Sequence, residues 1–144
     1  MAKYAQGKFS IKNPEKYVGK GVPRYRSSWE FVMMNFLDNN NNVIRWASEA
    51  IRIPYKNPLT GKSTMYVPDF FVQYRTKNNK VCSEIVEIKP KKQSLIEAKA
   101  SAQDRATVAV NYAKWAAAEA FCKKQGLVFR VITEDQIFNQ GKRK

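Results

Sequence analysis

The first apolar segment of the chain has a helical period. Its apolar side chains recur at Trp29, Val32, Met33 and Phe36. Ser27, with Glu30 three residues later, forms a capping box before the segment, and the aspartate and four asparagines of residues 38–42 end it. The pattern therefore predicts a helix from Ser27 to about residue 38.

Three segments rich in β-branched and aromatic residues follow, and each is predicted to be a strand. They span residues 43–55, 65–74 and 81–88, with short polar turns at 56–62 and 76–80 between them. Strands joined by short turns pair in antiparallel fashion. The sequence therefore predicts an antiparallel meander of three strands.

A long helical region is predicted after the meander. It begins at Ser94, which forms a second capping box with Glu97, and it ends before Gly126, a C-cap. Its predicted apolar stripe consists of Ile96, Ala102, Ala106, Val110, Ala113, Ala117 and Phe121. A fourth strand at 127–132 and a last turn of helix at 134–138 complete the pattern.

This order of elements predicts an α/β fold (an α+β mixed sheet) in a single domain. The chain has 144 residues, of which 44% are hydrophobic, and this is enough for one core. We assign the domain to residues 27–140, between a basic arm at 1–26 and a basic tail at 141–144. Residues 1–26 have no clear periodicity, so a disordered tail remains an alternative to an arm that packs or lies along a phosphate backbone. The aromatic residues of this stretch favour the arm.

The charge of the chain points to a polyanionic partner. Lys and Arg total 26 against 12 Asp and Glu, a formal net charge of +14. Nucleic acid is the leading candidate because binding to phosphates releases counterions. An anionic membrane would also fit the charge, but we find no signal peptide and no apolar run near the roughly 18 residues of a membrane span.

The chain contains no histidine. This excludes a Ser-His-Asp triad, an HNH-type nuclease site and a His-ligated zinc site. Any catalysis must therefore depend on carboxylates, lysine, hydroxyl groups and a hard cation.

Glu87-Ile88-Lys89 ends the third predicted strand and is the first candidate for chemistry. Side chains two apart on a strand share a face, so Glu87 and Lys89 point the same way and Ile88 points into the opposite, apolar side. The carboxylate can bind a divalent metal. The lysine can orient or deprotonate an attacking water, or stabilise charge on a phosphate. By itself, such a motif is more often a surface ion pair.

Asp69 lies in an apolar run, between Pro68 and Phe70. A buried, unpaired acid is costly, so Asp69 requires a partner or an ion, unless it faces water from a bulge or an edge strand. Neighbouring second and third strands would bring Asp69 within reach of Glu87. Two adjacent carboxylates repel each other unless a cation lies between them, which is typical of a Mg²⁺ site.

Glu30 is the third candidate acid, although its capping box explains it equally well. Basic residues flank the candidate acids in the sequence, and we favour substrate phosphate contacts for them over a solvated charge run. These predicted DNA-binding residues are Arg24, Arg26, Lys91 and Lys92.

The ordered set of motifs resembles the PD-(D/E)xK nuclease superfamily, which has a restriction-endonuclease-like core. Within it, the chain is similar to the head completion nucleases of T4-like tailed phages, which are related in pattern to TnsA-type transposon endonucleases. The likeness covers nearly the whole chain. It rests on four stretches: Tyr25-Arg26-Ser27-Ser28-Trp29-Glu30, Tyr66-Val67-Pro68-Asp69-Phe70, Glu87-Ile88-Lys89-Pro90 and Phe129-Arg130-Val131-Ile132-Thr133-Glu134.

The resemblance implies Mg²⁺-dependent cleavage of DNA, with Mn²⁺ able to substitute. Asp69, Glu87 and the Ile88 carbonyl would hold the metal, Lys89 would act on the attacking water, and Glu30 would complete the acidic cluster or bind a second metal. A polar residue of the second helix assists in some superfamily members, and the candidates here are Gln103, Asn111, Tyr112 and Lys114.

The resemblance also implies a role in phage head completion and DNA packaging. The expected partners are DNA and phage head or portal proteins, with a homodimer as one way to cut both strands. The expected location is the host cytoplasm, with association to the virion as an extension.

Two other functions remain as alternatives. A non-catalytic DNA-binding structural protein of the phage head would explain the charge but not the acid beside Pro68. An RNA-binding module would use tryptophans as stacking platforms, but Trp29, Trp46 and Trp115 each lie in an apolar pattern typical of a core.

Overall fold

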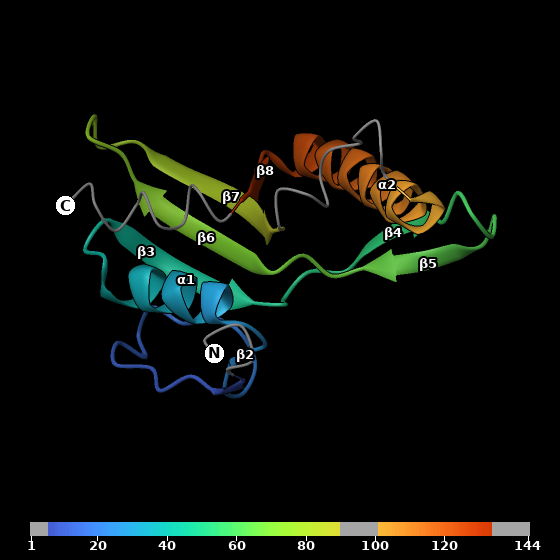
Figure 1. Cartoon of the computed structure of the whole chain (residues 1–144). Coiled ribbons are helices and arrows are strands. Elements are labelled where there is room, and N and C mark those ends of the chain that lie inside the picture. Colours follow the sequence, from blue (N-terminus) through green and yellow to red (C-terminus); the bar gives the residue numbers. More distant parts are fainter. Residues whose placement is uncertain (1–5, 90–100, 134–144) are drawn as a thin grey trace.

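A mixed sheet of four strands forms the centre of the computed structural model, which describes residues 6–89 and 101–133 (Figure 1). The strands lie in the order β3, β6, β7 and β8, and only the last pair is parallel. Their bounds are Val43–Ser48 for β3, Phe70–Arg75 for β6, Val81–Ile88 for β7 and Val128–Ile132 for β8. Helix α1 (Ser28–Asn39) precedes these strands, and helix α2 (Ala102–Gln125) connects β7 to β8.

The predicted sequence of helix, antiparallel meander, helix and final strand is confirmed at this level. Strand β6 pairs with β3 on one side and with β7 on the other, both antiparallel. Strand β8 lies parallel to β7 because a long helix connects them, as parallel pairing requires. The last predicted turn of helix, at 134–138, lies outside the described residues.

Two of the predicted strands are in fact interrupted. The segment 43–55 divides into β3 and β4 (Ile53–Lys56), and the segment 65–74 divides into β5 (Ser63–Tyr66) and β6. Pro68 lies in the second gap and cannot donate to a sheet ladder, while Glu49 lies in the first with a left-handed φ of 52°. Strands β4 and β5 therefore form a separate hairpin that extends from the main sheet beneath α2 (Figure 1).

The two faces of the main sheet belong to two different apolar clusters. On β7, Val86 and Ile88 pack with Met34 of α1, whereas Ile85 packs with Ala118 of α2 and residues of the β4–β5 hairpin. Alternation along the strand therefore directs Ile88 toward the α1 face, as predicted. It directs Glu87 and Lys89 toward the α2 face.

Both helices differ in detail from the predicted patterns. In α1, Val32 is exposed and Met34 and Leu37 are buried instead, because the core contacts α1 along a stripe displaced from the predicted one. Helix α2 begins after the N-cap Ser101, and the capping box predicted at Ser94 lies outside the described residues. The fully buried side chains of α2 are Val108, Asn111, Ala118 and Cys122. Ala117 and Phe121 of the predicted stripe are half-buried against the core. Gly126 is the predicted C-cap, with φ 73°.

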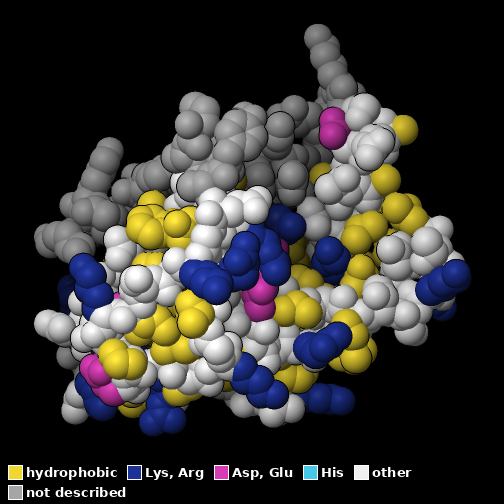
Figure 2. Space-filling model, turned by 90° about the horizontal axis from the view of Figure 1, so that it is seen from below, with side chains coloured by type: hydrophobic (Ala, Val, Ile, Leu, Met, Phe, Trp, Pro, Cys, Tyr) yellow, Lys and Arg dark blue, Asp and Glu magenta, His cyan; other side chains and the backbone are white. Residues whose placement is uncertain are grey.

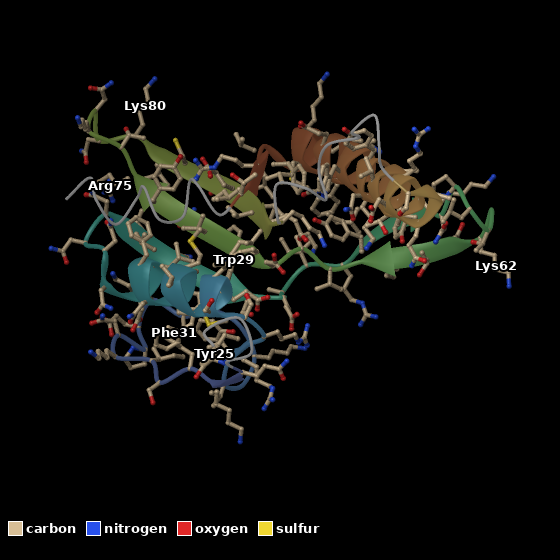
Figure 3. All side chains as sticks on the ribbon, viewed as in Figure 1. Tyr25, Trp29, Phe31, Lys62, Arg75 and Lys80 are labelled. Atoms are coloured by element: carbon tan, nitrogen blue, oxygen red, sulfur yellow. The ribbon has the colours of Figure 1, made fainter. Side chains whose placement is uncertain are left out.

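The described part of the predicted arm packs against the sheet. Phe9 is buried and meets Trp46 edge-on, with ring centroids 5.9 Å apart. The short strands β1 (Gly7–Lys8) and β2 (Arg24–Tyr25) pair with each other below α1, where Tyr25 contacts Phe31 (Figure 3). Residues 7–25 thus contribute to the core on the α1 side. Whether they form a functional unit apart from 27–140 stays a prediction.

Neither of the helices in the described residues is long and apolar enough to cross a membrane.

Candidate active site

Asp69 and Glu87 lie side by side where β6 meets the end of β7. Phe70 pairs with Val86 in the antiparallel ladder, so Asp69 and Glu87 occupy the next facing positions, on the α2 side of the sheet. The backbone N–H of Ile88 donates to Asp69 Oδ2 at 2.8 Å, which fixes the Asp69 carboxylate against β7. The neighbouring strands thus bring together two acids that are 18 positions apart in the sequence.

Glu87 is buried, and each of its carboxylate oxygens has a partner. The hydroxyl of Tyr66, at the end of β5, donates to Glu87 Oε1 at 2.7 Å. The ammonium of Lys89 lies 3.4 Å from Glu87 Oε2, and Lys89 is partly exposed. The expected sharing of a face by Glu87 and Lys89 is therefore seen directly. A buried carboxylate with two donors is held in one orientation.

The pair of acids is electrostatically strained in the protein alone. Burial raises the pKa of Asp69 well above its usual value, and the negative charge of Glu87 raises it further. Burial also raises the pKa of Glu87, while Tyr66 and Lys89 act in the opposite direction. Both shifts mean that the site disfavours its own negative charge and would be stabilised by an added cation.

Glu30 takes part in capping α1 and also lies near the acid pair. Its backbone N–H donates to Ser27 Oγ at 3.2 Å, and its own Oε1 accepts from the N–H of Arg26 at 3.1 Å. Burial raises the pKa of Glu30, and the charges of Glu49 and Glu87 contribute. Ser27 therefore caps α1 as predicted, whereas the Glu30 side chain bonds Arg26 rather than the N-cap residue, so the capping box is only half formed. This capping does not exclude a role for Glu30 in the electrostatics of the acid pair.

Comparison with known proteins gives a family and a relative for this chain. Residues 40–134 match the family described as "TnsA-like endonuclease N terminal". The chain belongs to the TnsA-like endonuclease family. It is also similar to the head completion nuclease of Enterobacteria phage T4, with 35% identity over 142 residues that cover 90% of this chain and 91% of the relative. The family match includes Asp69, Glu87 and Lys89, whereas Glu30 precedes it.

The acid pair of this TnsA-like endonuclease fits a hard divalent cation. Within residues 6–89 and 101–133, no group of three or more His, Cys, Asp or Glu is arranged to hold a metal ion. Mg²⁺ does not need such a group, since proteins bind it through one or two carboxylates and it keeps several waters. Asp69 and Glu87 supply two carboxylates whose raised pKa values reflect a charge that a cation would neutralise. The donor set therefore fits Mg²⁺ with Glu30 as a nearby charge.

The predicted DNA-binding residues have different surroundings. Arg24 is exposed on β2, and Arg26 forms an ion pair with Glu49. Lys91 and Lys92 lie outside the described residues. Basic side chains border a small acidic group on the face seen in Figure 2, so phosphates approaching this face would meet positive charge first.

Three further residues lie near the site. The sequence motifs give no role to Tyr66 and Glu49, and the family resemblance offers Lys114 as one of four candidates on the second helix. Tyr66 reaches Glu87 from the β4–β5 hairpin, which the sequence pattern had merged into one strand with β6. Glu49 connects β3 to the site, because its N–H donates to the carbonyl of Asp69 at 2.9 Å. The charge of Lys114 of α2 interacts with those of Lys89 and Glu87. The sequence signal for Tyr66 is a hydroxyl-bearing side chain three positions before Asp69.

Replacing Tyr66 by phenylalanine is expected to lower the free energy of unfolding of the metal-free protein by about 1–3 kcal/mol. The change leaves the buried Glu87 Oε1 without its donor, and an unsatisfied buried acceptor costs about that much. Chemical denaturation with EDTA present measures it. Tyr55→Phe is the matched control, since Tyr55 lies on the paired strand β4 and no hydrogen bond of its hydroxyl is seen within the described residues. Equal stability of Tyr66→Phe and Tyr55→Phe would contradict the role assigned to the Tyr66 hydroxyl.

Proposed function

We propose that this protein is a Mg²⁺-dependent DNA endonuclease that hydrolyses phosphodiester bonds at Asp69, Glu87 and Lys89. The observation that carries the proposal is a pair of acids with raised pKa values beside a lysine, in a member of an endonuclease family with a net charge of +14. Glu87 of this pair is buried and Asp69 is half-buried. A non-catalytic DNA-binding protein would gain nothing from this arrangement. It would carry the electrostatic cost of the acids without use.

Asp69 and Glu87, with the Ile88 carbonyl, are the residues that would hold the metal. When bound there, Mg²⁺ would lower the pKa of a coordinated water and stabilise negative charge on the scissile phosphate. Mn²⁺ would substitute, because it prefers the same oxygen donors. Glu30 would add negative charge at the site or serve a second metal. Ile88 N–H and Tyr66 hold the two carboxylates in place for this purpose.

Lys89 acts on the reacting groups directly. Its ammonium lies beside Glu87 Oε2 and is partly exposed, so it can also donate to a water or to a phosphate oxygen. A donor held beside the metal ligands orients the attacking water or stabilises the charge that develops on the phosphate. The ion pair with Glu87 keeps Lys89 in position for either role.

DNA is the proposed substrate, and basic side chains are its proposed contacts. Exposed Arg24 and Arg26, together with Lys91 and Lys92, would bind backbone phosphates of the substrate. Arg26 would exchange its ion pair with Glu49 for a phosphate. Such contacts position the duplex without reading its sequence.

The biological setting that we propose is the completion of phage heads. The support is the similarity to the T4 protein whose name is head completion nuclease, which extends over nine-tenths of both chains. Phage head or portal proteins would be the partners, in the host cytoplasm or on the virion. A homodimer would bring two sites to one duplex and allow both strands to be cut.

A plasmid assay with the purified protein tests the proposed function. We expect nicking or linearisation of supercoiled plasmid in Mg²⁺ or Mn²⁺, and complete loss of cleavage in excess EDTA that is restored by added Mg²⁺. Cleavage that persists in EDTA would contradict metal dependence. Tight, salt-sensitive DNA binding without cleavage in any divalent cation would favour the non-catalytic head protein instead.

A further inference from the structure

A groove opens beside Lys89, between the first half of α2 and the turn of the β4–β5 hairpin. It has a volume of about 450 Å³. The side chains that line it include Leu59, Lys89, Gln103, Thr107, Asn111 and Lys114. The α2 members with polar side chains recur at positions 103, 107 and 111, which is one stripe along the helix. Lys89 lines the same groove as this stripe.

Lys114 also lines this groove, and its ammonium lies near the rings of two tyrosines. Its ammonium lies 5.7 Å from the centroid of the Tyr66 ring and 6.0 Å from that of Tyr55. Both rings belong to the β4–β5 hairpin and hold the cation from one side through cation–π attraction. Within the described residues, Lys114 forms no ion pair with a carboxylate.

Among the described residues, the charge of Lys114 therefore has no directly paired carboxylate, and it lies close enough to a second cation, Lys89, to interact with it. Burial lowers the pKa of Lys114, and the positive charge of Lys89 lowers it further, against an opposing effect of Glu87. Lys89 already pairs with Glu87, whereas the contacts of the Lys114 ammonium within residues 6–89 and 101–133 are those with the tyrosine rings. Two half-buried ammonium groups facing one groove repel each other until an anion lies between them.

We propose that Lys114 and Lys89 bind one phosphate of the DNA backbone between them, and that the strand leaves this point along the polar stripe of α2. The inference rests on the proposed function, since it takes DNA as the ligand. It adds a substrate-binding residue on α2 that belongs to neither the acid pair nor the predicted basic contacts. It also assigns a function to the β4–β5 hairpin, because Tyr55 and Tyr66 of this hairpin hold Lys114 beside the site.

The test measures DNA affinity as a function of salt concentration for Lys114→Gln. A labelled duplex is titrated with full-length protein in Ca²⁺, and gel electrophoresis checks that the duplex stays uncut during the titration. The variant is expected to bind about tenfold more weakly, and the slope of log K against log salt is expected to become shallower by about 0.9, the loss of one phosphate contact. Lys114→Arg keeps the charge and is expected to keep the slope.

The matched control is Lys80→Ala. Lys80 lies at the turn between β6 and β7, at the far end of the sheet from the β4–β5 hairpin and its Lys62 (Figure 3). We expect this variant to keep both the affinity and the slope. A Lys114→Gln variant with the salt slope of the control would overturn the inference, and so would a variant whose thermal midpoint falls while its slope stays that of the wild type. Failure of the wild-type protein to bind or cut DNA would overturn the proposed function itself, which is a separate outcome.

Discussion

Lys89→Ala is expected to slow DNA cleavage by about 10²- to 10⁴-fold, the usual range for loss of a group that donates or accepts a proton at a reacting centre. The ammonium of Lys89 lies 3.4 Å from Glu87 Oε2, so it acts at the acid pair itself. Lys114 also lines the groove beside Lys89, but it extends from α2. We therefore do not expect Lys114 to replace Lys89 beside Glu87. The fold is expected to persist, since Lys89 is partly exposed.

Single-turnover cleavage of a labelled duplex in Mg²⁺ measures this effect. DNA binding in Ca²⁺ is expected to weaken by no more than about tenfold, because the variant loses one phosphate contact at most. Lys80→Ala removes the same charge at the far turn of the sheet and is expected to cut at the wild-type rate. Wild-type cleavage by Lys89→Ala would show that the lysine takes no part in the reaction.

Asp69→Asn is expected to reduce cleavage at least about 100-fold and, at the same time, to stabilise the metal-free protein. Removing a metal ligand costs at least as much activity as removing a residue that orients one. The amide oxygen of asparagine can still accept the N–H of Ile88, so the local geometry is preserved. The repulsion between Asp69 and Glu87 disappears, and we expect the free energy of unfolding to rise by about 0.5–2 kcal/mol, the usual gain when a functional strain is removed.

The stability difference between Asp69→Asn and the wild type is expected to change with pH in a defined direction. The pKa of Asp69 is raised in the folded protein above the ordinary 3.8, so the folded chain retains a proton that the unfolded chain has already lost. Stability of the metal-free wild type therefore falls as the pH rises from about 4 through the raised pKa. Asparagine does not titrate, so the variant loses this part of the fall and its advantage grows with pH.

Urea denaturation in EDTA at several pH values measures the stability, and the plasmid assay in Mg²⁺ measures the activity. Asp104→Asn is the matched control, because Asp104 is an exposed aspartate in the first turn of α2. That variant is expected to keep its activity and to lose a little stability, since the acid complements the helix dipole. An Asp69→Asn protein that is less stable than the wild type at neutral pH would contradict the electrostatic account of the acid pair.

The acid pair was predictable from the sequence because strand geometry is local and periodic. Glu87 and Lys89 share a face wherever a strand forms, and an antiparallel neighbour brings Asp69 close to Glu87. The register that aligns them depends on the turn at 76–80 and on which side chains enter the core. Contacts between residues of two consecutive strands can thus be predicted from the sequence pattern.

The partners of the pair were not predictable in the same way. Tyr66 approaches Glu87 because the chain leaves the main sheet at Pro68 and turns as a separate hairpin. Lys114 approaches Lys89 because α2 packs on that hairpin. The apolar pattern of 65–74 gives no sign of the interruption other than Pro68. The apolar pattern of α2 predicts a stripe of mainly alanines, whereas the most buried side of the helix includes Val108 and Cys122.

The sequence by itself determined the order of the main elements, the helix caps at Ser27 and Gly126, the sharing of one face by Glu87 and Lys89, and the absence of histidine chemistry. These follow from local geometry and composition, which act over a few residues. Only the tertiary structure decided where strands divide, which side of α2 is buried, and that tyrosines of a hairpin hold a lysine beside the acids. Those outcomes depend on packing and charge between segments far apart in the chain, and periodicity within one segment contains no information about its distant neighbours.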